Sequence, residues 1–166
     1  MMAPEELGRL IDAQAAALTL YARQWCAAPE DVVQDAFVRL AGMRPPPSHV
    51  VPWLFAVVRN AAISAARSER RRRQRESVVA ARTPGWFVPS ERGPLDAEAA
   101  TKALAALPAD EREAIVAHLW GGLSFDDVGK LIGVSAATAH RRYVAGLESL
   151  RSKLGDPCPP KTQTQN

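Results

Sequence analysis

The chain has 166 residues, of which 47% are apolar and only 6% aromatic. This composition suits one or two small helix-rich domains and disfavours a sheet protein. Two cysteines without a CxxC motif and three unclustered histidines exclude a recognisable metal site or disulfide framework, so neither metal nor cofactor is expected. A net charge of +3, no secretory-type N-terminus and no apolar run of about 18 residues predict a soluble cytoplasmic protein without a membrane partner.

Two amphipathic helices are expected first. Over residues 4–26, apolar side chains recur at the three- and four-residue spacings of a helix with one buried face: Leu7, Leu10, Ile11, Leu18, Tyr21, Ala22 and Trp25. Pro29 suits the first position of a second helix over 29–43, with Glu30 at the positive end of its dipole. That helix is predicted to bury Val33, Ala36, Phe37 and Leu40, and to expose Asp31, Gln34, Asp35 and Arg39.

The proline-rich loop "GMRPPPSHVVP" precedes a third helix, which Pro52 is predicted to open. Its early turns are expected to bury Trp53, Leu54, Val57, Val58 and Ala61. Its later turns are basic, because residues 53–76 carry seven arginines against two acidic residues, whereas residues 1–52 carry four against six. A local basic face predicts a polyanionic partner. For the arginine run over 67–75, the alternative is a frayed, solvated helix end.

The second half of the chain has clear start and stop signals. A linker over 77–95 is expected, then a helix that ends at Leu107 and another from Pro108 to the glycines at 121–122. Ser124 is predicted to cap a helix over 125–132 that stops at Gly133, and Ser135 to cap the last helix. The last helix has an apolar stripe of Ala139, Tyr143, Leu147, Leu150 and Leu154. Residues 156–166 are expected to be disordered.

The segment "LSFDDVGKLIGVSAATAHRRYVAGL" reads as a helix-turn-helix, whose second helix enters the DNA major groove. The first turns of that helix offer Ala136, Ala137, Thr138, His140, Arg141 and Arg142. Arginine can give two hydrogen bonds to a guanine edge, and Ser135 with the free N–H groups of the helix start can hold a phosphate. The alternative is a plain helical hairpin with an exposed basic stripe.

Three segments together resemble the small extracytoplasmic-function (ECF) type of sigma-70 family RNA polymerase sigma factors, which keep regions 2 and 4. "PEDVVQDAFVRL" and "PWLFAVVRNAAISAAR" are similar to two region 2 motifs of that family. "LPADEREAIVAHLWGGLSFDDVGKLIGVSAATAHRRYVAGLESLRSKL" is similar to region 4. The resemblance covers about residues 15–155. It implies an all-α protein of two small helical domains, region 2 over 1–76 and region 4 over 96–155.

The resemblance also implies partners and roles. The partners are core RNA polymerase (its β′ coiled coil and β flap), promoter DNA and, as a candidate inhibitor, an anti-sigma factor. The polymerase-docking residues would be Asp31, Gln34 and Asp35. Residues for the −10 element would be Arg44, Ser48, His49, Arg59, Asn60, Arg67 and Arg71. Residues for the −35 element would be Ser135, Ala136, Thr138, His140, Arg141 and Arg142. The −10 loop departs from the family, being shorter, richer in proline and without the usual aromatic.

Two other function classes stay open on the sequence alone. A stand-alone helix-turn-helix regulator leaves the acidic helix and "WLFAVVRN" without a role. A nucleic-acid-processing enzyme predicts an acidic or histidine-rich centre, and no nucleophile, carboxylate pair or metal cluster is recognisable. The sequence therefore favours a non-enzymatic initiation factor that acts by binding and by capture of a DNA strand.

Overall fold

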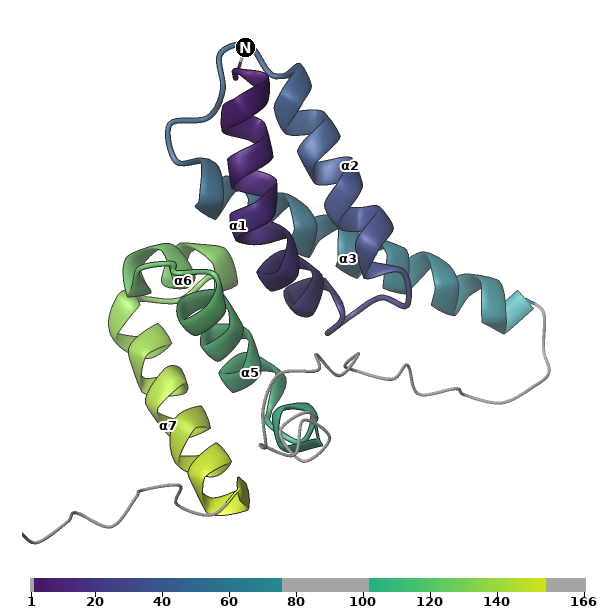
Figure 1. The fold of residues 1–166 in the computed structure, drawn as a ribbon. Helices are drawn as coiled ribbons and strands as arrows, with labels where there is room; N and C mark the ends of the chain where they lie inside the picture. The colour runs from purple at the N-terminus through teal and green to yellow at the C-terminus, as the bar shows by residue number, and fades with distance from the viewer. Residues whose placement is uncertain (1, 76–101, 155–166) are drawn as a thin grey trace, which may run out of the picture.

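The computed structural model describes residues 2–75, here the N-terminal half, and residues 102–154, here the C-terminal half. Both are built from helices, as expected, and contain no strand (Figure 1). Residues 102–105 are also helical, and the labelled elements are α1 (Pro4–Ala22), α2 (Pro29–Gly42), α3 (Val50–Arg75), α5 (Ala109–Ile115), the π-helical turn η1 (Val116–Trp120), α6 (Phe125–Ile132) and α7 (Ala136–Leu154). None of these helices is both long and apolar enough to span a bilayer. The predicted linker and tail lie outside the described ranges.

The N-terminal half is a three-helix bundle of α1, α2 and α3. Pro29 occupies the first turn of α2 as predicted, and the four apolar residues expected to be buried there are buried. From α1, the core receives Leu18, Tyr21 and Ala22, whereas Ile11 is exposed and Trp25 lies beyond the helix end. The bundle therefore forms around the apolar stripes of α1 and α2.

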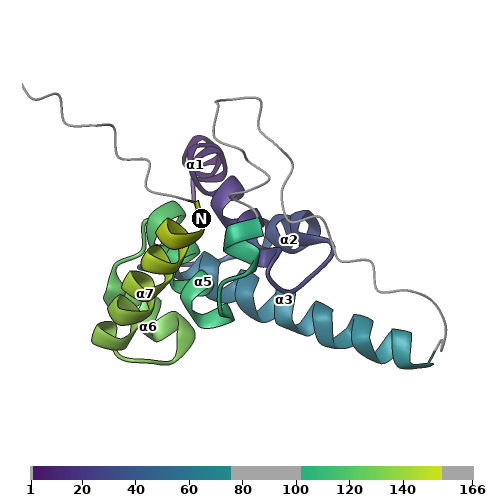
Figure 2. The same ribbon diagram turned by 90° about the horizontal axis from the view of Figure 1, so that it is seen from below.

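Helix α3 differs from the prediction in its start and in its buried face. It begins at Val50, two residues before Pro52, because a proline anywhere in the first turn removes no helical hydrogen bond. Its buried residues are Leu54, Phe55, Val58 and Ala62, while Trp53, Val57 and Ala61 are only partly buried. Its basic later turns extend away from the other helices in both views (Figure 1, Figure 2).

The C-terminal half follows the predicted caps closely. The Ser124 side chain accepts a hydrogen bond from the backbone N–H of Asp127, and α6 ends at Gly133, whose φ of 76° is the left-handed conformation that glycine adopts without strain. The helix predicted from Pro108 instead divides into α5 and the π-helical turn η1. On α7, Ala139 is buried and Tyr143, Leu147 and Leu150 are partly buried, but Leu154 is 46% exposed, against expectation.

The two halves share one core. Buried side chains of α1, α2 and α3 form a single cluster with Ala114, Val116, Ala117, Leu123, Val128 and Ala139 from the C-terminal half. Phe55 lies so close to Gly121 that a Cβ at that glycine would be 2.4 Å from the Phe55 Cζ. This contact helps to explain why Phe55 is fully buried: part of its cover comes from a segment more than sixty positions further along the chain.

Candidate nucleic-acid interfaces

Helices α6 and α7, joined by the turn at 133–135, form a helix-turn-helix. A Cβ at Gly129 would lie 2.7 Å from the Val134 carbonyl oxygen, so this glycine lets the turn pack closely against α6. The Ser135 hydroxyl accepts a hydrogen bond from the backbone N–H of Thr138, which caps α7 as predicted. The unit is thus held by local caps at both helix starts.

Aromatic stacking fixes the angle between these two helices. The rings of His118 and Phe125 stack with centroids 4.1 Å apart, and Tyr143 of α7 packs edge-on against both. His118 Nδ1 lies 2.7 Å from the carbonyl oxygen of Leu123. The predicted recognition helix is therefore attached to the rest of the C-terminal half through a packed aromatic group.

The predicted −35 residues fall into two groups. Ser135, His140 and Arg141 are exposed, and Ala136 and Thr138 are partly exposed beside them. Arg141 donates a hydrogen bond to the Thr138 hydroxyl at 2.9 Å, so the side chains of these early turns form one polar surface. Arg142 instead forms a 2.9 Å ion pair with Asp110 of α5, and its side chain is 29% exposed. It points back to its own domain.

Most of the predicted −10 residues lie on open surface. Arg44, Ser48 and His49 occupy the exposed loop before α3, and Asn60, Arg67 and Arg71 are exposed along α3. In the arginine run, Arg72 and Arg73 form ion pairs with Glu69 at 3.4 and 2.8 Å, so part of the positive charge is locally balanced.

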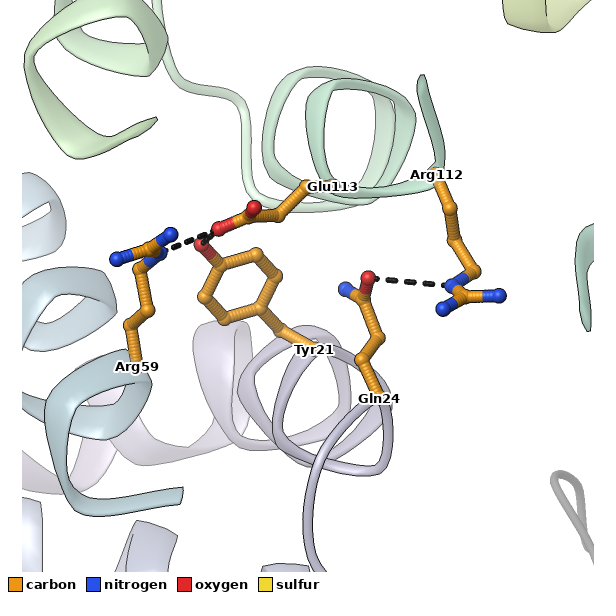
Figure 3. A network of polar contacts seen from close by, with 5 residues as sticks. All are labelled: Tyr21, Gln24, Arg59, Arg112 and Glu113. Atoms are coloured by element: carbon orange, nitrogen blue, oxygen red, sulfur yellow. Dashed lines mark hydrogen bonds and ion pairs between the residues drawn. The ribbon is translucent and has the colours of Figure 1, made fainter. Parts of the chain in front are cut away.

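Arg59 is the exception among these residues. Its Nε donates to Glu113 Oε1 at 2.5 Å, and the same oxygen accepts from the Tyr21 hydroxyl at 2.7 Å (Figure 3). Glu113 is 6% exposed, and the Arg59 guanidinium also lies over the Trp25 ring. Burial, and then the charge of Glu113, raise the pKa of Tyr21 well above its usual value. The hydrogen bond to Glu113 raises the pKa of Arg59.

The acidic surface of α2 is exposed to solvent. Asp31, Gln34 and Asp35 are exposed on one side of the helix, as predicted, and Val38 continues that side one turn later with 65% of its surface exposed. Asp31 also borders a hollow of about 770 Å³, whose lining includes Trp25, Val32 and Ala65. Charge and apolar surface therefore lie side by side here.

The similarity to known proteins agrees with this arrangement. Residues 10–72 match the model of sigma-70 region 2, and residues 97–150 match the model of sigma-70 region 4. The chain is 34% identical over 130 residues to the RNA polymerase sigma factor CarQ of Myxococcus xanthus, covering 76% of this chain and 75% of that one. This chain belongs to the sigma-70 family. It is a sigma factor of the ECF type, being also 32% identical over 155 residues to the ECF sigma factor SigL of Mycobacterium tuberculosis (87% and 86% covered).

Solved structures show the same fold. The sigma factor resembles the sigma factor RpoE of Bartonella quintana, solved in complex with the anti-sigma factor NepR, with a TM-score of 0.74 and 25% identity. The match covers 93% of this chain and 99% of that chain. CnrH, solved with the cytosolic domain of CnrY, shares the fold at a TM-score of 0.54, with 90% and 88% covered. Membership of this family means that the sigma factor acts in promoter recognition for transcription initiation.

Sequence reasoning missed the group that joins the two halves. The sequence pattern assigns Tyr21 to an apolar stripe and assigns no role to Glu113 within the helix predicted from Pro108. One signal was available: Glu113 lies one turn before Ala117 on the side of the helix that carries the apolar residues. A carboxylate on an apolar face requires a buried partner, but the sequence gives no indication of which distant residue supplies it.

Proposed function

We propose that this sigma factor recruits core RNA polymerase to a two-part promoter, with each half of the chain bound to a different part of the DNA. The C-terminal half reads the −35 duplex through the first turns of α7. The N-terminal half holds the melted −10 strand along α3 and the loop before it. The factor acts where polymerase and chromosome are, in the cytoplasm, and contributes binding and strand capture without a bond-making step of its own.

One observation carries this proposal: a helix-turn-helix with an exposed polar surface and a bundle with a separate acidic surface occur in one chain. A regulator that only bound duplex DNA would use the first and have no role for the second. On α2, the carboxylates of Asp31 and Asp35 can pair with basic groups of the β′ coiled coil, which would add mainly association rate and register. Val38 and the hollow beside Asp31 would add apolar area to the contact with polymerase, and the charged residues alone do not supply such area.

The contact with the β flap is expected to use apolar surface of the C-terminal half. Leu119 and Trp120 end η1 with 55% and 45% of their surfaces exposed, and large apolar groups exposed together mark a contact surface. An anti-sigma factor is a further candidate partner, since the sigma factor RpoE of similar fold was solved with NepR.

The proposal is tested with core polymerase and a promoter library. We expect transcription starts at a fixed distance from a shared two-part motif. Duplex binding by the chain without a stable polymerase complex would show that it is a stand-alone regulator.

The docking assignment has its own test. Asp31→Ala with Asp35→Ala should weaken polymerase binding by at least about tenfold, the effect of losing about 1.4 kcal/mol of interface energy. Glu5→Ala with Glu6→Ala is the matched control, because both residues are exposed on the first turn of α1 and the charge change is the same. Equal effects in the two double variants would refute docking through α2.

A further inference from the structure

Glu113 belongs to the C-terminal half, yet both of its hydrogen-bond donors belong to the N-terminal half. Tyr21 is on α1 and Arg59 is on α3, and both donate to the same carboxylate oxygen (Figure 3). In the same view, Arg112 reaches from α5 to the Gln24 side chain at 3.3 Å. The side of α5 that carries Glu113 therefore faces the N-terminal bundle.

A buried carboxylate at this position has two stable environments. While the halves are packed together, its charge is balanced by the Arg59 guanidinium and the Tyr21 hydroxyl. If the halves separate, water solvates it and Arg59 becomes available. A buried ion pair stabilises a fold little compared with apolar groups of the same size, but removing one member leaves the other unbalanced. Glu113 therefore adds little to the strength of the contact between the halves and mainly determines which surfaces meet.

Arg59 is a poor phosphate ligand while it is paired with Glu113. Its Nε donates to that carboxylate, which balances the charge of the guanidinium, and the negative charge of Glu113 repels a phosphate that approaches the other N–H groups. Only 27% of the Arg59 side chain is exposed while the pair is formed. Glu113 of the C-terminal half and Trp25 of the N-terminal half thus both cover this arginine.

We propose that Glu113 is an autoinhibitory latch: in the free protein it holds the C-terminal half over Arg59 and withholds that residue from single-stranded DNA. The latch opens when the halves are drawn apart, as binding at two separated promoter elements requires. This rests on the proposed function in one respect, the role of Arg59 in holding the −10 strand. Contacts such as Phe55 with Gly121 also support the closed state, so the latch charge is one of several contributions to the population of that state.

Two readouts on the full chain test the latch. Spin labels on Ala16→Cys of α1 and Ser152→Cys of α7, both exposed positions, report the separation of the halves by pulsed electron spin resonance. Cys158 is replaced by serine in this background, and Cys26 is buried. Binding of a fluorescein-labelled single-stranded DNA of mixed sequence is followed by anisotropy on the unlabelled chain.

Glu113→Gln should give longer and broader distances than the parent. It should also bind the oligonucleotide roughly tenfold more tightly, as expected if the open state is occupied about a tenth of the time in the parent. Glu148→Gln is the matched control, because it removes the same charge from an exposed position of the C-terminal half. It should leave the distances unchanged and alter affinity far less.

The outcomes separate the latch from the role of Arg59. Unchanged distances in Glu113→Gln, with affinity no higher than in Glu148→Gln, would overturn the latch. Longer distances with no gain in DNA affinity would show that Glu113 holds the halves together but that Arg59 is not part of the −10 site. Adding Arg59→Ala to Glu113→Gln decides this point directly: the distances should stay long while the gain in DNA affinity is lost.

Discussion

The two predicted DNA-binding surfaces differ in how they are presented. On the C-terminal half, the side chains of Ser135, Thr138 and Arg141 lie at or near the surface and hydrogen-bond to one another. On the N-terminal half, Arg59 is held by a carboxylate of the opposite half. Under the proposed function, the −35 surface is accessible to duplex DNA as it stands, whereas the proposed latch keeps Arg59 of the −10 surface covered until the halves move apart. The two proposals together predict that duplex contact can precede strand capture.

The same contrast appears in the packing. The helix-turn-helix is held by local caps and by aromatic rings of its own half. The surface of α3 around Arg59 depends instead on Phe55, which is covered by both α1 and the C-terminal half. Substitutions that affect the contact between halves should therefore change the N-terminal surface more than the C-terminal one.

The largest effect is expected from Phe55→Ala. The ring is fully buried, 4.9 Å from the Tyr21 ring, so its removal leaves a cavity in the shared core. Loss of a buried phenylalanine lowers the free energy of unfolding by about 3–5 kcal/mol. Urea unfolding followed by circular dichroism measures it. Val38→Ala, at an exposed position of α2, is the control and should change stability by no more than about 0.5 kcal/mol. Equal losses of unfolding free energy in Phe55→Ala and Val38→Ala would show that Phe55 is not part of the core.

This shared core also marks the limit of what the sequence could predict. The predicted roles of Ser124, Gly133 and Ser135 at helix ends are confirmed, because caps and left-handed glycines are decided within a few residues. The buried stripe of α2 is predictable for the same reason. On α3 the prediction is confirmed for Leu54 and Val58 but misses Phe55, which is covered partly by Gly121, a residue that a local hydrophobic pattern does not contain.

The candidate sites divide along the same line. The exposure of Asp31, Gln34 and Asp35 follows from their position opposite a local apolar stripe, and so was predictable. The engagement of Arg142 by Asp110 and of Arg59 by Glu113 was not, because each pair joins helices whose relative placement the sequence does not give. Residue type indicates which side chains are candidates for DNA binding, and tertiary packing determines which of these candidates are exposed.

The next largest effect separates the two neighbouring arginines of α7. Arg141→Ala should reduce discrimination at one −35 base pair by about 1–3 kcal/mol, the worth of a paired base contact. Arg142→Ala, its matched control, should leave sequence preference unchanged and cost at most about 1 kcal/mol of stability, because the residue forms a partly exposed ion pair with Asp110. Competition binding against single-base variants of the −35 duplex measures both. A uniform loss across all sequences in Arg141→Ala would assign it to phosphate.

Alkaline pH should act on the contact between the halves. Because burial and the charge of Glu113 raise the pKa of Tyr21, the unfolded chain loses its tyrosine proton at a lower pH than the folded one. The contribution of Tyr21 to stability is therefore fully present below about pH 10, the usual tyrosine value, and falls above it by up to about 1.4 kcal/mol per pH unit. Tyr21→Phe should flatten this fall, as measured by urea unfolding from pH 9 to 11. A Cys26→Ala background removes the parallel contribution of the buried thiol, whose pKa is also raised.

The smallest effect is expected from Glu30, whose ion pair contrasts with that of Glu113. Glu30 accepts a 2.9 Å hydrogen bond from Arg23 within the N-terminal half, and 62% of its side chain is exposed. The hydrogen bond lowers the pKa of Glu30, so its contribution is present above about pH 4.5 and is lost as pH falls through the lowered value. Water screens this pair, which limits the loss in Glu30→Gln to about 0.2–1 kcal/mol at neutral pH, with unchanged affinity for single-stranded DNA. Urea unfolding and anisotropy together check this. If Glu30→Gln gained as much DNA affinity as Glu113→Gln, the loss of any carboxylate would favour DNA binding. The surface pair of Glu30 and the buried pair of Glu113 would then not differ in their effect on DNA binding.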